Sequence, residues 1–331
     1  MTKANLDMAR LRERHRLMLR IRAFEEAAIR AADNTLVLGA IHPSVGQEAV
    51  AAGVCAPLLK DDLLLSTHRG HGHTLAKGAD AGAMMRELFG REGGNCGGKG
   101  GSMHIADFDV GMLGANGVVG ANINIAAGAA HAIKLRGGDQ ITVCIFGDGA
   151  VNRGPFLEGL NWAAAFELPV MFVCEDNGYA STTKSSVVTG GGDLCARAEA
   201  LGVPTESVDG NDVMAVEETA LRLGAAIREG AGPRFLHART YRLLGHTSVD
   251  PAKYRPTGEA NAKWADDPIQ RAADLLASAG ISEDDLKADA TAAEIEMQAA
   301  YDNAASAPWP SVGSAYDDVQ DVGAVLAPQG L

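Results

Sequence analysis

The stretch Ile141-Thr-Val-Cys-Ile-Phe-Gly-Asp-Gly149 decides the fold class, because a short apolar run there ends abruptly at an aspartate between two glycines. Residues 154–167 follow with apolar side chains at helical spacing, and residues 169–174 form a second apolar run, which ends in Glu175-Asp-Asn-Gly178. A strand, a helix and a strand in such close succession predict a right-handed unit whose parallel strands are buried on both faces.

The alternation of apolar runs and alanine-rich stretches continues through the middle of the chain. Residues 215–229 have the pattern of a helix and residues 234–241 that of a strand, whereas residues 266–304 are helical. We therefore expect an α/β fold, a parallel sheet with helices on both faces, and extra helices near both ends. The expected divisions are an N-terminal helical segment (1–35), an α/β domain (36–265), and C-terminal helices with a tail (266–331).

Composition argues against several classes of function. The chain has 331 residues, with 29 Lys and Arg against 42 Asp and Glu, and this net charge of −13 disfavours binding to nucleic acid. No apolar run reaches the roughly 18 residues that a membrane span needs. The five cysteines include no C-x-x-C pair, which fits reduced thiols, so we expect a cytoplasmic protein.

The arginine-rich stretch at residues 11–30 allows two interpretations. It could be a transit peptide, although such peptides are poor in acidic residues and this stretch contains Glu25. Its apolar residues Ile21, Phe24 and Ala28 follow one another at helical intervals. This spacing favours an amphipathic helix of the mature protein.

Two polar side chains follow the two apolar runs of the central unit. Asp148 comes after the first run and Asn177 after the second, so both belong at the carboxyl edge of a parallel sheet. Carboxylate and amide oxygens are ligands that Mg²⁺ accepts alongside phosphate oxygens. Gly149 and Ala150 precede a helix whose N-terminus favours anions. The unit therefore predicts a site for Mg²⁺ and a diphosphate.

Other interpretations of the glycine-containing segments are less favoured. Either polar segment alone could be a tight turn, but their shared sheet edge favours the metal site. A dinucleotide-binding Rossmann fold needs a third glycine that Gly147-Asp-Gly-Ala-Val-Asn152 lacks. The glycine-rich stretch 90–101 nearly matches a nucleotide-binding loop, but Gly100 stands where a Ser or Thr is required. We expect that stretch to be a flexible loop near the entrance of an active site.

Two further motifs have a structural interpretation beside a functional one. His68, His71 and His73 surround Arg69 without an obvious supporting carboxylate, which favours a positive loop facing an anion over a zinc cluster. Residues 121–135 are mostly small, and they predict either a subunit contact or a helix buried against the sheet. The lone histidines, which we expect to be structural, are His15, His131 and His237.

A longer motif runs through the central unit, where Gly147-Asp-Gly149 is followed by Asp176-Asn177. It resembles the thiamine-diphosphate motif, which opens with Gly-Asp-Gly and ends in Asn-Asn. Other segments agree with it: Gly46-Gln-Glu-Ala49, Thr67-His-Arg-Gly-His71, Gly97-Gly-Lys-Gly-Gly-Ser-Met-His104, Asn116-Gly-Val-Val-Gly120 and Leu168-Pro-Val-Met-Phe-Val-Cys-Glu-Asp-Asn-Gly-Tyr179. In order, from about residue 17 to about 310, they resemble the alpha subunit of the decarboxylating component of 2-oxo acid and acetoin dehydrogenase complexes.

The resemblance implies a metal site and a diphosphate site. Asp148, Asn177 and the backbone carbonyl of Tyr179 would hold Mg²⁺. Arg69 and His246 would contact the diphosphate, and two backbone amides would join them, those of Gly149 and Ala150. Asp176 replaces the first Asn of the motif's final pair, and its extra negative charge could weaken the affinity for diphosphate.

The resemblance also implies a place for the organic part of the cofactor. Gly117 and Val119 would line the aminopyrimidine pocket. His42 and His246 would face the reacting thiazolium as proton donors or electrostatic stabilisers. His68 stands where relatives often have a tyrosine.

The activity that the resemblance implies depends on thiamine diphosphate and Mg²⁺. Acetoin would be cleaved or pyruvate decarboxylated, with a branched-chain 2-oxo acid as the alternative substrate, and the acyl unit would pass to a separate lipoyl acyltransferase. Such enzymes need a second domain, whose glutamate activates the cofactor. This chain has no room for that second domain. The resemblance therefore implies a beta subunit, an α₂β₂ heterotetramer, and no activity of this chain alone.

Overall fold

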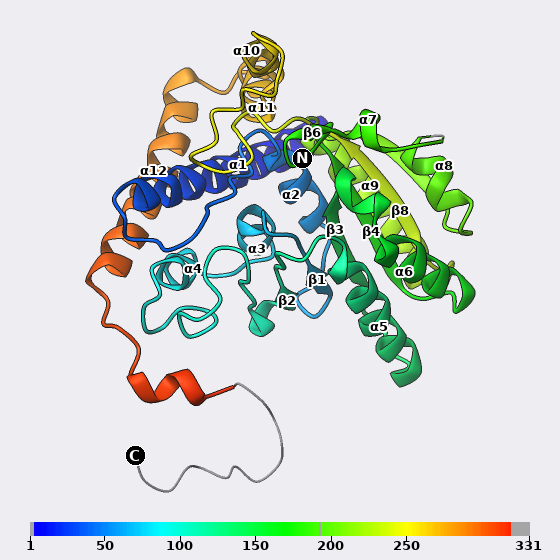
Figure 1. Cartoon of the computed structure of the whole chain (residues 1–331). Coiled ribbons are helices and arrows are strands. Elements are labelled where there is room, and N and C mark those ends of the chain that lie inside the picture. The colour runs from blue at the N-terminus through cyan, green and yellow to red at the C-terminus, as the bar shows by residue number, and fades with distance from the viewer. Residues whose placement is uncertain (1–2, 192, 319–331) are drawn as a thin grey trace, which may run out of the picture.

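A six-stranded sheet forms the centre of the computed structural model, which describes residues 3–191 and 193–318 (Figure 1). The strand order is β2-β1-β3-β4-β8-β7, and every neighbouring pair is parallel. A separate antiparallel pair, β5 (Tyr179–Ala180) and β6 (Thr183–Lys184), follows β4. The strands of the main sheet are β1 (Leu63–Leu65), β2 (Met112–Gly114), β3 (Thr142–Gly147), β4 (Val170–Asp176), β7 (Thr205–Asp209) and β8 (Arg234–Arg239).

The central unit of the sequence forms as predicted. Strand β3 leads into α6 (Gly154–Ala165), which returns to β4 alongside β3. Side chains alternate along β3, so that Cys144 and Phe146 pack on one face of the sheet while Val143 and Ile145 pack on the other. This two-sided burial explains why the strand is continuously apolar from Val143 to Phe146.

Helices cover both faces of the sheet, and the predicted fold class is confirmed. On one face lie α5 (Ala121–Arg136), α6 and α8 (Leu194–Glu199), and on the other lie α2 (Glu48–Cys55) and α9 (Val213–Arg228). The shorter helices are α3 (His71–Ala76), α4 (Ala81–Leu88), α7 (Ser185–Val188) and α10 (Glu259–Lys263). Short 3₁₀ helices occupy Phe108–Val110, Asp148–Asn152, Trp264–Asp266 and Val312–Tyr316.

The terminal helices pack together beside the sheet. In Figure 1, α1 (Lys3–Asp33, dark blue) lies along α12 (Glu283–Ser306, orange), with α11 (Pro268–Ser278) nearby. Phe24 of α1 and Met297 of α12 share a buried apolar cluster. The stretch at 11–30 is thus a helix of the folded core, as its spacing predicted. Arg12 and Arg20 add ion pairs to α12.

The chain beyond α12 is described only in part. Arg91 stacks on Trp309, with its guanidinium carbon 3.6 Å from the ring centroid, which fastens this segment near the glycine-rich stretch. The rest of the expected tail, residues 319–331, lies outside the described residues. Within the described part of the chain, none of the helices has the length and apolarity needed to cross a membrane.

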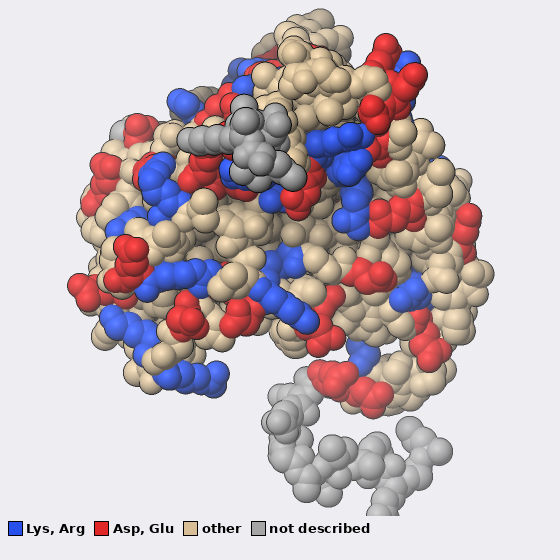
Figure 2. Space-filling model, turned by 180° about the vertical axis from the view of Figure 1, so that it is seen from behind, with Lys and Arg blue, Asp and Glu red and all other residues tan. Residues whose placement is uncertain are grey.

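The small-residue stretch at 121–135 forms a helix that is buried against the sheet on one side, and the alternative prediction of a subunit contact stays a prediction. Helix α5 buries Ile123 and Ala126 against the sheet and α6, whereas Ile125 and Leu135 are exposed. The remaining surface has mixed charge. On the face shown in Figure 2, basic and acidic side chains are interspersed rather than gathered into one continuous basic field.

Candidate active site

The two predicted metal ligands emerge at the same edge of the sheet. Gly147 of β3 pairs with Glu175 of β4, so Asp148 and Asn177 follow adjacent strand ends. Both side chains are buried, and both line one cavity of about 440 Å³. The sequence-predicted residues that also line this cavity are His42, His68, Arg69, Gly117, Val119, Gly149, Ala150, Tyr179 and His246.

The turn after β3 brings the backbone close to the cavity. Gly149 lies within the short 3₁₀ helix, and a Cβ atom there would come within 2.9 Å of the Ala180 Cβ atom. Only glycine fits here without displacing the segment around Ala180. Gly149 and Ala150 lie within the 3₁₀ helix that precedes α6. Their amides therefore belong to this tight turn rather than to the first turn of α6.

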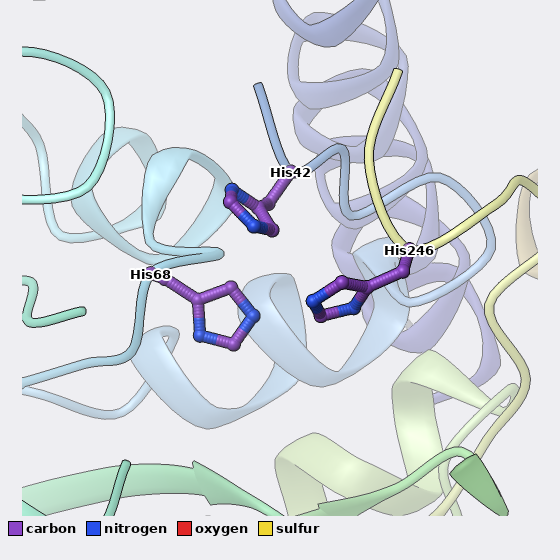
Figure 3. A group of neighbouring side chains, drawn as sticks. All are labelled: His42, His68 and His246. Carbon is purple, nitrogen blue, oxygen red and sulfur yellow. The ribbon is translucent and has the colours of Figure 1, made fainter. Parts of the chain in front are cut away.

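Three histidines meet on one side of the cavity. Figure 3 shows His42, His68 and His246 pointing toward one another from three separate loops. The ring centroid of His42 lies 4.6 Å from that of His68 and 5.0 Å from that of His246. Burial, reinforced by the nearby Arg69, lowers the pKa of His42 to about 4, of His68 to about 2 and of His246 to about 4. All three rings are therefore neutral at pH 7.

The neutral histidines keep hydrogen-bonding capacity for a ligand. Nδ1 of His42 and Nε2 of His68 are buried and find no partner among the described residues. Nδ1 of His246 lies 3.4 Å from Arg69 and 3.3 Å from Arg242. Because a guanidinium only donates, this Nδ1 accepts, and the ring carries its proton on Nε2. The three rings also lie close enough together to hold a metal ion, which makes them a rival to the strand-end site.

Two buried guanidinium groups make the cavity electropositive. Arg69 donates to the backbone carbonyl groups of Pro43 and His246, and Arg242 donates to the Ser181 carbonyl and the Tyr254 hydroxyl. These acceptors are all neutral. Burial, together with the neighbouring Arg242, lowers the pKa of Arg69 to about 9. A buried positive charge of this kind favours an anionic ligand.

The carboxylates at the strand ends show the complementary need for a cation. Burial raises the pKa of Asp148 to about 6, with the Asp176 carboxylate adding to the effect and a hydrogen bond from Ser185 opposing it. Burial acts in the same direction on Asp176, but hydrogen bonds from His237 and the Gly178 amide hold its pKa below the ordinary value. Asp148 is thus a buried carboxylate whose charge is disfavoured, and a hard cation such as Mg²⁺ would stabilise it.

Sequence reasoning missed several residues of the cavity. Gln47 lines it and accepts a hydrogen bond at 3.2 Å from the Asn177 side chain. The signal was present, since Gln47 lies in the segment Gly46-Gln-Glu-Ala49. Arg242 is almost fully buried at the cavity wall. Ser185, which donates to Asp148 from the start of α7 without lining the cavity, lies in a polar stretch with no periodic pattern to predict its position.

The expectation for the H-x-x-H-x-H motif was only partly right. His68 and Arg69 line the cavity, but His71 and His73 lie in α3 and turn into the core. Nδ1 of His71 is 2.8 Å from Glu25, and Nε2 of His73 is 3.0 Å from Glu175. The supporting carboxylates are distant in sequence, so they could not be found by local inspection.

The lone histidines also have defined surroundings. His131 stacks on Trp162 and Phe166 at the surface, while His15 lies on the buried face of α1. His237 bridges Asp176 and Ser207, which connects it to the strand-end carboxylates. His237 is therefore part of strand β8 and also positions a carboxylate beside the candidate site.

Oxygen donors at adjacent strand ends, next to buried arginines, define the kind of site in which enzymes hold the diphosphate of a cofactor through a metal ion. The profile of the Dehydrogenase E1 component family matches residues 16–313, and the chain belongs to this family. The family implies thiamine diphosphate as the cofactor and makes the chain part of an oxidoreductase. This assignment replaces the dinucleotide-binding alternative.

Curated relatives carry two kinds of name. The chain is 46% identical over 242 residues to the alpha subunit of acetoin:2,6-dichlorophenolindophenol oxidoreductase of Bacillus subtilis, covering 73% of each chain. It is 45% identical to the Cupriavidus necator protein of the same name, covering 77% of this chain and 76% of the relative. It is 39% identical to the pyruvate dehydrogenase E1 component subunit alpha of Rhizobium meliloti, covering 92% of this chain and 88% of the relative.

Proposed function

We propose that this chain is the alpha subunit of a thiamine-diphosphate- and Mg²⁺-dependent dehydrogenase that cleaves acetoin or decarboxylates pyruvate. The acyl unit would pass to a lipoyl acyltransferase component. The names of the relatives support both substrates. The observation that carries the proposal is that Asp148 and Asn177 follow adjacent strand ends in a cavity that also contains Arg69 and His246.

The residues present fit the proposed cofactor. Asp148, Asn177 and the Tyr179 carbonyl would hold Mg²⁺, because all three offer hard oxygen atoms. Arg69 and His246 would bind the diphosphate, with the amide groups of two further residues, Gly149 and Ala150. Arg242 adds a second buried cation that this anion would satisfy. Gly117 and Val119, which line the same cavity, would contact the aminopyrimidine.

The histidines would handle protons beside the reacting atoms. When bound, thiamine diphosphate supplies a carbon nucleophile and an electron sink for breaking a bond next to a carbonyl group. The Nε2–H group of His246 can donate to an oxygen on which negative charge develops. Nδ1 of His42 can accept a hydrogen bond or a proton. His68 would help to exclude water from this side of the cavity.

A beta subunit would complete the active site. Among the described residues that line the cavity, Glu175 is the one glutamate, and its carboxylate already binds His73. The described chain also contains a single large sheet. The glutamate that activates the cofactor would therefore come from the partner in an α₂β₂ heterotetramer.

The proposal also includes the location of the protein and the division of the chain into parts. All five cysteines are unpaired in the described structure, which supports a cytoplasmic location. The proposed division into a helical segment (1–35), an α/β domain (36–265) and a C-terminal part (266–331) places all strands of the main sheet in the middle part. The terminal helices α1 and α12 pack on this middle part through an apolar cluster that also includes α4.

A reconstitution experiment tests the proposed function. Purified chain with Mg²⁺, thiamine diphosphate and substrate should show no turnover, and adding the beta subunit should start reduction of an artificial electron acceptor. A panel of acetoin, pyruvate and branched-chain 2-oxo acids then identifies the substrate. Turnover by the chain alone would contradict the shared site, and no turnover of any of these substrates by the complex would contradict the activity.

A further inference from the structure

A buried carboxylate occupies the centre of the glycine-rich loop. Glu87, near the end of α4, has no exposed surface. Its Oε2 atom accepts hydrogen bonds of 2.8 Å from the backbone amides of Cys96 and Gly98. Its Oε1 atom accepts bonds of 2.7 Å from Gly100 and 3.0 Å from Gly101. The loop thus wraps its backbone N–H groups around an anion supplied by the protein itself.

The glycines are required by this close wrapping. A Cβ atom at Gly94 would lie 2.5 Å from Oε2 of Glu87, and one at Gly100 would lie 2.7 Å from the His104 carbonyl oxygen. Gly98 has a φ of +76°, and its Cβ would lie 2.8 Å from the backbone of Gly90. Backbone amides that converge on an anion are typical of phosphate-binding loops. Here the expected flexible loop is instead closed around Glu87.

The closed loop leads directly into the wall of the cofactor cavity. Ser102 follows the last of the four amides, and its Oγ atom lies 2.9 Å from Nε2 of His71. Nδ1 of His71 faces the Glu25 carboxylate and therefore carries a proton, so the ring connects Ser102 to Glu25 in the core. The next residue, Met103, lines the cavity.

The same segment supports the proposed aminopyrimidine pocket. The Nε2 atom of His104 lies 3.4 Å from where a Cβ atom of Gly117 would stand. The segment from Ser102 to His104 therefore borders both the cavity and the Gly117 turn. The loop that precedes this segment is held by four N–H bonds to Glu87 and by contacts of the Cys96 Sγ atom with the backbone of His104 and Ala106.

We propose that Glu87 is a positioning residue for the reaction: its carboxylate holds the loop at 94–101 and thereby places Ser102 against His71 and Met103 at the cofactor cavity. Four N–H donors offset the cost of burying the charge, and a neutral side chain cannot reproduce them. Glutamine would retain one acceptor oxygen and turn an NH₂ group toward two other N–H donors. The effect on catalysis rests on the proposed function, whereas the effect on the loop does not.

Amide hydrogen exchange of the full chain tests the loop directly. In Glu87→Gln, the amides of Cys96, Gly98, Gly100 and Gly101 should exchange at least about tenfold faster than in the wild type, because their shared acceptor is disrupted. The control is Glu92→Gln, an exposed glutamate of the same segment, which should leave the exchange unchanged. Equal protection in Glu87→Gln and wild type would overturn the proposal.

Kinetics of the reconstituted complex test the consequence for the active site. A misplaced cavity wall should lower kcat/KM on the order of 10- to 100-fold in Glu87→Ala. Added formate or acetate should restore part of this loss by filling the space among the four amides, while chloride at equal ionic strength should not. Rescue by carboxylate distinguishes loop positioning from a general loss of packing in α4. A variant with normal kcat/KM would overturn the positioning role.

A second variant covers the case in which Glu87 substitutions fail to fold. Gly98→Ala keeps the carboxylate but places a Cβ atom against the Gly90 backbone, so it should loosen the same amides and lower kcat/KM. Unchanged exchange and kinetics in Gly98→Ala would contradict the proposal. An inactive wild-type complex would instead contradict the proposed function, and the exchange result would remain valid by itself.

Discussion

The Oδ2 atom of Asp176 lies 2.8 Å from Nε2 of His237, which comes from the neighbouring strand β8. Its other oxygen, Oδ1, accepts a hydrogen bond from the Gly178 amide. Asp176 stands where the thiamine-diphosphate motif has an asparagine. Both of its oxygen atoms therefore have hydrogen-bond donors, and the carboxylate at this position is locally compensated.

Replacing Asp176 by the asparagine of the motif tests this compensation. In Asp176→Asn, the affinity for thiamine diphosphate with Mg²⁺ should change by less than about threefold, or about 0.7 kcal/mol. Calorimetry on the reconstituted complex measures the difference. A large gain in affinity would instead show that the aspartate repels the diphosphate.

Removing the other strand-end carboxylate should have a much larger effect. Asp148→Ala deletes one of the proposed oxygen ligands, so Mg²⁺-dependent binding of the cofactor should be lost. The matched control is Asp61→Ala, an exposed aspartate at the surface. Titration calorimetry compares the two variants. If Asp148→Ala bound the cofactor like the wild type, the ligand assignment would be wrong.

The three neutral histidines should make the cofactor-free chain sensitive to acid. Burial and Arg69 lower their pKa values to about 4 or below, whereas in the unfolded chain each lies near 6.5. Between pH 6.5 and about 4 the unfolded state binds more protons, so stability falls as the pH falls. Asp148 acts in the opposite direction. Its pKa is raised to about 6 in the folded state, so below that pH the folded state binds more protons at this group than the unfolded state does, which adds stability.

A single substitution isolates the contribution of the histidines. His68→Asn should reduce the pH dependence of the free energy of unfolding by up to about 1.4 kcal/mol per pH unit. Urea denaturation at pH 6.5, 5.5 and 4.5 gives the slope of the unfolding free energy against pH for the variant and for the wild type. Identical slopes for the variant and the wild type would mean that His68 is not held neutral.

The ion pair beneath α1 provides a test of stability away from the site. Glu48 is fully buried, receives a hydrogen bond from Arg22 and accepts another from the Gly46 amide at 2.9 Å. Glu48→Ala should cost about 1–3 kcal/mol, because it removes the acceptor of the Gly46 amide and of Arg22 Nε, while Asp267 still pairs with Arg22. The exposed pair of Glu13 with Arg14 is the control, and Glu13→Ala should cost less than about 1 kcal/mol. Similar losses in urea denaturation would contradict this account.

The fold could be predicted where burial leaves a periodic pattern. The runs at 141–146 and 169–174 became β3 and β4, and the helix expected at 215–229 became α9. The strands β1 and β2 have three residues each, which is too short for a period to show. Strand β7 was missed as well, since its polar residues at an edge of the sheet give no continuous apolar run.

The site was predictable to the extent that its residues sit in recognisable motifs. The structure brings Asp148, Asn177 and His246 to one cavity although long stretches of chain separate them. The partners of His71 and the anchor of the glycine-rich loop were not predictable. Glu25 and Glu87 act through contacts that depend on how α1 and α4 pack, and no local sequence feature sets them apart.

The metal position tests the central claim most directly. Crystals of the reconstituted complex with thiamine diphosphate and Mn²⁺, which scatters anomalously and takes the same oxygen ligands, locate the ion. We expect one anomalous peak between Asp148, Asn177 and the Tyr179 carbonyl, at about 2.1 Å from each oxygen as for Mg²⁺. A peak among His42, His68 and His246, with none at the strand ends, would contradict it.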